Sequence, residues 1–197
     1  MDTIRRAALH CIVAGAALAV LVGYAGTARA DDMDICHDKS GDVAIAACTR
    51  AIKSGGLNKH NLAVAYTSRG VEWRAKGDVE RAIQDHSEAI RIYPSLPEAW
   101  YNRANAHRQK RELDGSIKDY TEAIRLNPRE PDFYNNRGNS YKDTGDFDRA
   151  ITDYTEAIRL NPRKAIFYKN RGEAFEAKGD ATTAKADFAT ADSLAKQ

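Results

Sequence analysis

The chain has 197 residues, of which 43% are apolar and 29% are charged. This composition excludes a disordered chain, and the length suffices for one ordinary domain or a short array of repeats. Three of the 30 basic residues and one of the 28 acidic residues lie in the first thirty positions, so the remainder has 27 of each and is formally neutral. A neutral chain gives no support for nucleic-acid binding.

Residues 1–30 have the pattern of a secretory signal peptide. Two arginines near the start precede a run of small and apolar residues over 7–25, and the sequence Ala-Arg-Ala ends at Ala30. Signal peptidases cut after such a small-x-small sequence. We therefore predict cleavage after Ala30, a periplasmic or secreted protein, and no stable membrane span after cleavage. The alternative is an uncleaved membrane anchor, although the run is rich in Ala and Gly and short for a bilayer.

Residues 31–62 are expected to form an N-terminal cap, a degenerate half-repeat. The sequence Gly-Asp-Val at 41–43, followed by small and apolar residues, echoes Gly-Asp-Val at 77–79 and the helix expected after it. Cys36 and Cys48 are the cysteines that remain after signal cleavage, and in an oxidising compartment we expect a disulfide between them. This bond would pin the first part of the cap onto its helix and contribute roughly 2–3 kcal/mol.

The rest of the chain repeats itself every 34 residues. The run DYTEAIRLNPR begins at Asp119 and again at Asp153, and a looser copy, DHSEAIRIYPS, begins at Asp85. An internal period of this length is typical of repeat architectures. Taken in this register, the chain divides without gaps into units at 63–96, 97–130, 131–164 and 165–197.

Each unit has the pattern of two helices joined by a turn. We call a position within a unit a column, counted from the first residue of the unit. Rings occupy columns 4, 11 and 24, whereas small residues occupy columns 8, 20 and 27. At about 100° per residue, columns 4, 8 and 11 share one helix stripe and columns 20, 24 and 27 share another, so the helices can cross closely. A Gly-Asp pair at columns 15 and 16 of three units predicts the turn between them.

This spacing resembles the tetratricopeptide repeat, and the resemblance covers residues 63–197. It implies an all-α fold, a right-handed α-solenoid of helix-turn-helix (TPR) repeats, in which each copy covers the apolar face of its neighbour. Columns 21 and 28 are isoleucine in three units but Lys185 and Asp192 in the fourth, so we expect the last helix to be a C-terminal cap. With the export signal, the chain looks like a small TPR protein of a Gram-negative envelope.

Two columns of opposite charge are present in all four units. An unpaired arginine in the packing stripe would be costly, so we expect column 7 to form ion pairs with column 23 within or between units. The alternative is a ladder of arginines for acidic ligands, which the aspartates would neutralise. The expected pairs involve Arg69, Arg103, Arg137 and Arg171 with Asp85, Asp119, Asp153 and Asp187.

Columns 6 and 9 place asparagines on the opposite side of the first helix. Asparagine both donates and accepts, so a row of amides can bind the backbone of an extended peptide. In TPR proteins this face lines the concave groove, and the resemblance implies a peptide-binding site there, flanked by a ring and positive charges. The alternative is a merely solvated polar face. The candidates are Asn102, Asn105, Asn136, Asn139, Asn170, Tyr101, Arg108, Lys142 and Lys169. Acidic residues at Asp132, Asp143 and Glu173 oppose a dedicated C-terminal-carboxylate receptor.

The sequence contains no Gly-rich phosphate loop, no Gly-x-Ser-x-Gly and no His-Glu-x-x-His. His37 and His60 with the two cysteines do not have zinc-site spacing, so no metal or other cofactor is expected. The sequence therefore predicts a non-enzymatic protein- or peptide-binding scaffold or assembly factor of the cell envelope. The alternative is a structural protein that self-associates weakly through its helix faces.

Overall fold

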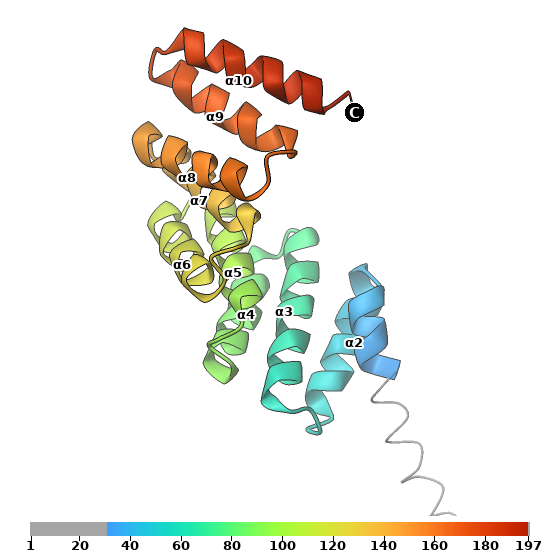
Figure 1. Ribbon diagram of the computed structural model, residues 1–197. Helices are drawn as coiled ribbons and strands as arrows, with labels where there is room; N and C mark the ends of the chain where they lie inside the picture. Colours follow the sequence, from blue (N-terminus) through green and yellow to red (C-terminus); the bar gives the residue numbers. More distant parts are fainter. Residues whose placement is uncertain (1–30, 197) are drawn as a thin grey trace, which may run out of the picture.

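The computed structural model describes residues 31–196, which form helices joined by short turns, with no strand in that range (Figure 1). The predicted signal peptide lies outside the described residues, as does Gln197. Within the described part, no helix combines the length and apolar character needed to cross a membrane.

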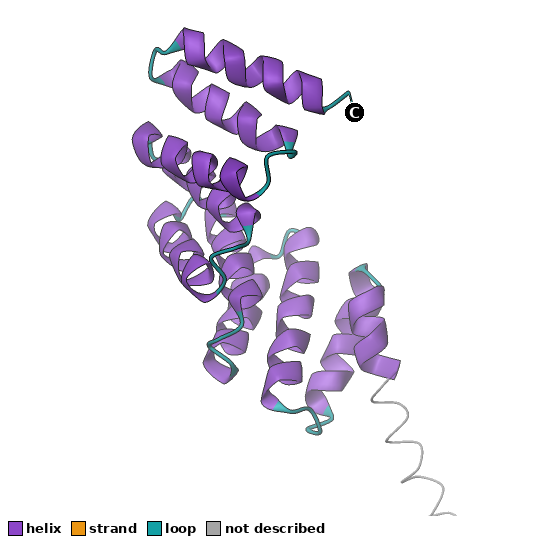
Figure 2. Cartoon of the chain, in the orientation of Figure 1, coloured by secondary structure: helices purple, strands orange, loops and turns teal. Residues whose placement is uncertain are grey.

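The helices pair into hairpins that stack in chain order, from α2 at one end to α10 at the other (Figure 1). Residues 31–38 are helical and precede α2. Each helix packs mainly on its neighbours in sequence, and the first helices α3, α5, α7 and α9 also contact one another in turn. The predicted all-α solenoid is confirmed (Figure 2). The helices are α2 (Gly41–Lys53), α3 (Lys59–Ala75), α4 (Val79–Ile92), α5 (Pro97–Gln109), α6 (Leu113–Leu126), α7 (Pro131–Asp143), α8 (Phe147–Leu160), α9 (Ala165–Ala177) and α10 (Ala181–Leu194).

The second, third and fourth predicted units each contain one complete hairpin. The predicted border between the cap and the first unit, however, does not coincide with the end of a helix. Helix α3 begins at Lys59, so it crosses the predicted border between the cap and the unit starting at 63. Its N-cap is Asn58, whose side chain accepts a hydrogen bond from the backbone N–H of Asn61. The repeat borders themselves stay predictions.

Small residues at column 8 allow the two helices of a hairpin to cross closely. A Cβ atom on Gly138 would lie 2.8 Å from Cε1 of Tyr154, which is closer than carbon atoms approach without displacement. Tyr154 is fully buried, as are Tyr120 and His86 at the same column. The core therefore consists of rings that cover small residues, as the column pattern predicts.

The turn between the two helices has the same Gly-Asp structure in three of the four hairpins. In three hairpins a glycine with positive φ precedes an aspartate that caps the second helix, as Gly145 (φ 82°) and Asp146 do for α8. In the second hairpin Arg111 occupies the glycine position with φ of 65°, and Glu112 makes no side-chain capping bond. Since residues with a Cβ avoid this region, the turn between α5 and α6 carries backbone strain.

The N-terminal cap is tied together covalently and to the first repeat. The sulfur atoms of Cys36 and Cys48 are bonded at 2.06 Å, which joins the helical segment 31–38 to α2. Helix α2 packs on α3, and Glu72 of α3 accepts a 2.6 Å hydrogen bond from the backbone N–H of Gly41. At the other end, Lys185 and Asp192 of α10 are exposed.

Candidate functional site

The arginine and aspartate columns form the same bidentate pair in every repeat. Each arginine donates from Nε and Nη2 to both carboxylate oxygens of the aspartate 16 residues later, over 2.7–2.9 Å. The aspartate side chains are only 4–9% exposed. In the first repeat, the hydrogen bond to Asp85 raises the pKa of Arg69. These arginines are therefore engaged inside the fold and unavailable as a ladder for ligands.

The same arginines also join neighbouring units. Nη1 of each donates to a hydroxyl of the preceding hairpin or cap, over 3.0–3.2 Å, and the acceptors are Thr49, Ser87, Thr121 and Thr155. One guanidinium thus contacts the two helices of its own hairpin and the helix before them. This column stabilises the stacking of repeats.

The column 9 asparagines bind buried tyrosines. The hydroxyl of Tyr120 donates to Oδ1 of Asn105 over 2.6 Å, and that of Tyr154 donates to Oδ1 of Asn139 over 2.8 Å. A buried phenol needs such a partner, and burial also raises the pKa of Tyr120. Both amides therefore have a structural role that the sequence analysis did not assign.

The other predicted amides lie along one face, which we call the groove face: the side chains at columns 2, 5, 6, 9 and 12 of α3, α5, α7 and α9. Asn136 donates to the hydroxyl of Tyr101 over 2.7 Å and accepts from Asn135 over 3.1 Å. Asn135 in turn accepts from Asn170 over 2.8 Å, so the row spans three repeats. Asn102 donates to the Glu98 carbonyl of its own helix. Asn170 is 8% exposed, and little of it can reach a ligand.

The predicted positive charges are mostly neutralised. Arg108 pairs with Asp143 at 2.9 Å, and Lys142 pairs with Glu173. Lys169 is exposed. Two of the opposing acids seen in the sequence, Asp143 and Glu173, therefore act as partners of these cations from the next repeat, whereas Asp132 pairs with Lys164.

A cavity opens on the groove face near the cap. Its volume is about 420 Å³, and it lies between α3, the start of α5 and the segment before α2. Its lining combines apolar residues of α3 with hydroxyl and amide groups: His37, His60, Val64, Thr67, Ser68, Val71, Leu96, Glu98 and Asn102. This mixture suits an apolar side chain whose backbone is hydrogen-bonded at the rim.

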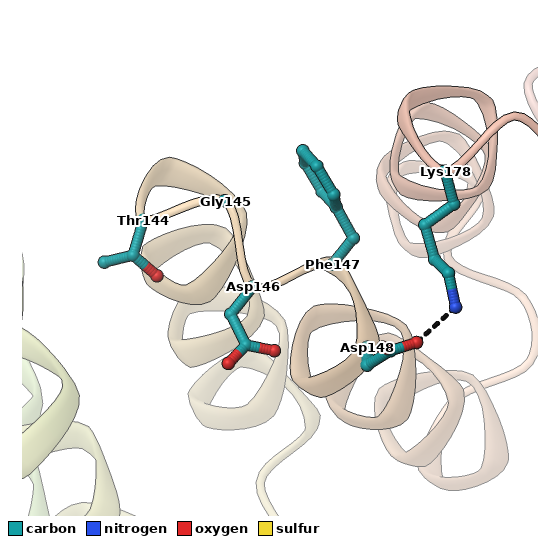
Figure 3. Close-up of a pocket in the computed structure, with 6 residues that line it drawn as sticks. All are labelled: Thr144, Gly145, Asp146, Phe147, Asp148 and Lys178. Carbon is teal, nitrogen blue, oxygen red and sulfur yellow. Dashed lines mark hydrogen bonds and ion pairs between the residues drawn. The ribbon is translucent and has the colours of Figure 1, made fainter.

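A second hollow, of about 500 Å³, lies at the turn between α7 and α8 (Figure 3). It is lined by Thr144, Gly145, Asp146, Phe147, Asp148 and Lys178. Its charged groups have structural partners, since Asp146 caps α8 and Lys178 pairs with Asp148. This hollow offers no nucleophile with an adjacent base.

Among residues 31–196, no three His, Cys, Asp or Glu side chains are grouped so that they could hold a metal ion. Sequence reasoning missed two residues of the groove face, Asn135 and Arg74. Asn135 stands at column 5, next to the column 6 asparagines, and the amide at that column could have indicated it.

Comparisons with known proteins agree with this architecture. The family described as TPR repeat matches residues 70–110, 104–145 and 138–179, together more than half of the chain. An uncharacterized protein of Methanocaldococcus jannaschii is 44% identical over 41 residues, which are 21% of this chain and 48% of that protein. The chain thus spans about half the length of the curated relative it matches.

Solved structures of MamA have the same fold. One crystal structure of MamA is 26% identical with a TM-score of 0.71, covering 79% of this chain and 88% of that one. Another is 25% identical with a TM-score of 0.72, covering 87% and 93%. MamA from Desulfovibrio magneticus has a TM-score of 0.76, covering 87% and 95%, but at 16% identity this likeness shows the fold alone.

Proposed function

Because the chain belongs to the tetratricopeptide-repeat family, we propose that it is a non-enzymatic scaffold or assembly factor that holds an extended protein segment on its groove face. The family and the likeness to MamA support a protein-interaction scaffold. One observation carries the finer proposal: amides of α7 and α9 form a polar row with the hydroxyl of Tyr101 on α5, and the neighbouring Asn102 lines the cavity.

The amide row retains hydrogen-bonding capacity. An asparagine side chain can donate two hydrogen bonds and accept two. Asn102 uses one N–H for its own helix, which leaves its carbonyl oxygen and second N–H for a ligand. A peptide backbone presents alternating donors and acceptors that such groups satisfy without reading side chains.

The proposed location is the cell envelope, after removal of residues 1–30. The disulfide between Cys36 and Cys48 supports an oxidising compartment. Expression of the full chain in a Gram-negative host, followed by fractionation and N-terminal sequencing, tests this. A periplasmic product beginning at Asp31 is expected, and a full-length product in the membrane fraction would favour the anchor instead.

Site-specific photo-crosslinking tests the groove. The photoreactive residue p-benzoylphenylalanine replaces Asn102 on the groove face or, as a control, Gln84, an exposed residue of α4. The chain is expressed in the envelope, irradiated, and its crosslinked segments are identified by mass spectrometry. Discrete partner segments are expected at Asn102 only. Equal crosslinking at Gln84, in a variant with unchanged circular dichroism, would place recognition elsewhere.

Self-association through helix faces is the second candidate. Val43 of α2 is 60% exposed and Ile166 of α9 is 42% exposed, the large apolar side chains most open to solvent among the described residues. Scattered apolar residues are normal on a monomer, so this candidate has less support. Sedimentation velocity across a hundredfold range of protein concentration tests for self-association. A monomer at every concentration would reject this candidate function.

A further inference from the structure

Arg74 on the groove face differs from its equivalents in later repeats. In the first three repeats column 12 holds Arg74, Arg108 and Lys142, of which the second and third pair with acids. Arg74 makes no ion pair with any described residue, and its Nε is buried without a hydrogen-bond partner. A partly buried cation without a counter-charge is costly to a fold.

The repeat explains why Arg74 lacks a partner. Gln109 stands 34 residues before Asp143, which pairs with Arg108. Glu173, the partner of Lys142, stands 31 residues after it, and the residue 31 positions after Arg74 is Asn105. At both positions where later repeats have an acid as partner of the column 12 cation, the position equivalent for Arg74 holds a neutral amide. Arg74 therefore has no counter-charge among residues 31–196.

Arg74 lies among rings that carry no negative charge at pH 7. It lies near His86, Tyr101 and Tyr120, since its charge acts on the pKa of each. Burial above all, and then the charges of Arg74 and Arg103, lower the pKa of His86 to about 3, so this ring is neutral at pH 7. Arg103, the other cation acting on His86, is already paired with its own aspartate.

Arg74 lies on α3 just beyond the cavity. Val71 lines the cavity and stands one turn before Arg74, and Ser68 lines it one turn earlier. At about 1.5 Å per residue, Arg74 is roughly 9 Å along the helix from Ser68. An extended peptide advances about 3.3 Å per residue, so this distance corresponds to two or three residues of a ligand.

The cavity itself does not suit an acid. Val64, Val71 and Leu96 supply apolar lining, and the exposed Glu98 adds a negative charge. An acidic ligand group is repelled there and attracted to Arg74. The two subsites thus differ in chemistry and lie at a fixed separation along α3.

On the basis of the proposed function, we propose that this end of the groove face binds a segment in which an apolar side chain fills the cavity and an Asp or Glu two or three residues away pairs with Arg74. The acid supplies the counter-charge that the later repeats supply to themselves. The partner is therefore an acidic, extended peptide segment.

The test uses random nine-residue peptides displayed on phage between Gly-Ser linkers, so that no free C-terminal carboxylate is present. They are selected on the purified full chain and on three variants. Arg74→Gln removes the charge, whereas Gln109→Asp leaves Arg74 in place and gives it the acid found opposite Arg108. Arg91→Gln is the control, because it removes the same charge from an exposed pair with Glu88 on α4.

We expect the unaltered chain and Arg91→Gln to enrich peptides with an acid two or three residues from an apolar residue. Arg74→Gln and Gln109→Asp should keep the apolar preference and lose the acid, and a selected peptide should bind them about tenfold more weakly. Gln109→Asp changes an exposed residue, so it keeps the test decisive if Arg74→Gln folds poorly.

Two results would overturn the inference, and they differ in what else they reject. Enriched peptides without an acid at that spacing, or the same acid preference on Gln109→Asp, reject the role of Arg74 and leave groove binding intact. No enrichment above bare support on any variant rejects peptide binding by the groove face, and the inference falls with it.

Discussion

Replacing His86 with phenylalanine should stabilise the protein, and increasingly so as the pH falls. His86 is fully buried, and neither ring nitrogen has a hydrogen-bond partner among the residues that the structure describes. Phe188 occupies the same column in the fourth repeat and packs over Gly172, as His86 packs over Gly70. Phenylalanine therefore fits the site. Tyrosine does not, because column 9 of this repeat is Val71 instead of an asparagine that could accept from its hydroxyl.

The magnitude follows from the pKa of His86, about 3 in the folded protein against 6.5 in an ordinary environment. Below pH 6.5 the unfolded chain binds a proton at His86 that the folded protein does not bind. The free energy of unfolding therefore decreases as the pH is lowered from 6.5 to 3. Each pH unit in this range amounts to about 1.4 kcal/mol. At pH 5 the unaltered chain should have lost about 2 kcal/mol through this group alone, a loss that His86→Phe avoids.

Urea unfolding followed by tryptophan fluorescence at pH 7.5, 6 and 5 measures this difference. Trp73 and Trp100 lie in the first and second repeats, close in sequence to the substitution. All other groups titrate alike in both proteins, so the difference between them isolates His86. A difference that stays constant from pH 7.5 to 5 would mean that His86 takes up its proton in the folded state.

Three further changes test the fold. Arg137→Ala leaves the nearly buried Asp153 without its bidentate partner and should cost about 3–5 kcal/mol in urea unfolding; an unchanged midpoint would show that water compensates the carboxylate. Arg111→Gly relieves the positive φ between α5 and α6 and should add about 1 kcal/mol by the same assay, while a loss would contradict the strain argument. Reducing the Cys36–Cys48 disulfide should remove about 2–3 kcal/mol from the cap, seen as faster amide exchange in α2, and unchanged exchange would show that packing on α3 alone holds it.

The fold could be predicted from the sequence because the same helix-turn-helix pattern occurs in several copies. Columns of small residues and rings recur at helical spacing, so each copy supports the interpretation of the others. The exception at Arg111 was visible as a missing Gly-Asp pair, but its strain depends on the backbone angle that the turn adopts. Period and packing were thus accessible, whereas local backbone geometry was not.

The contacts of the groove face were harder to predict from the sequence, because they depend on how helices are placed relative to one another. Whether Asn139 faces solvent or the hydroxyl of Tyr154 depends on how the two helices of a hairpin are rotated, which sequence spacing leaves open. A signal was nevertheless present. Columns 9 and 24 are Asn and Tyr together in the second and third repeats and Val and His together in the first, as a contacting pair would be.

Three departures from the repeat pattern lie in the first repeat. Among the described residues, the first repeat has a buried histidine without hydrogen bonds and an arginine without an acid, and its valine in place of an asparagine lines the cavity. Each of the first two costs stability that a copy of the third repeat would not. Natural proteins break local rules chiefly at functional sites. His86→Phe separates the two costs, because it removes the unsatisfied ring and leaves Arg74 in place. If stability rises while the acid preference of bound peptides is unchanged, the charge of Arg74 serves the ligand and the histidine does not.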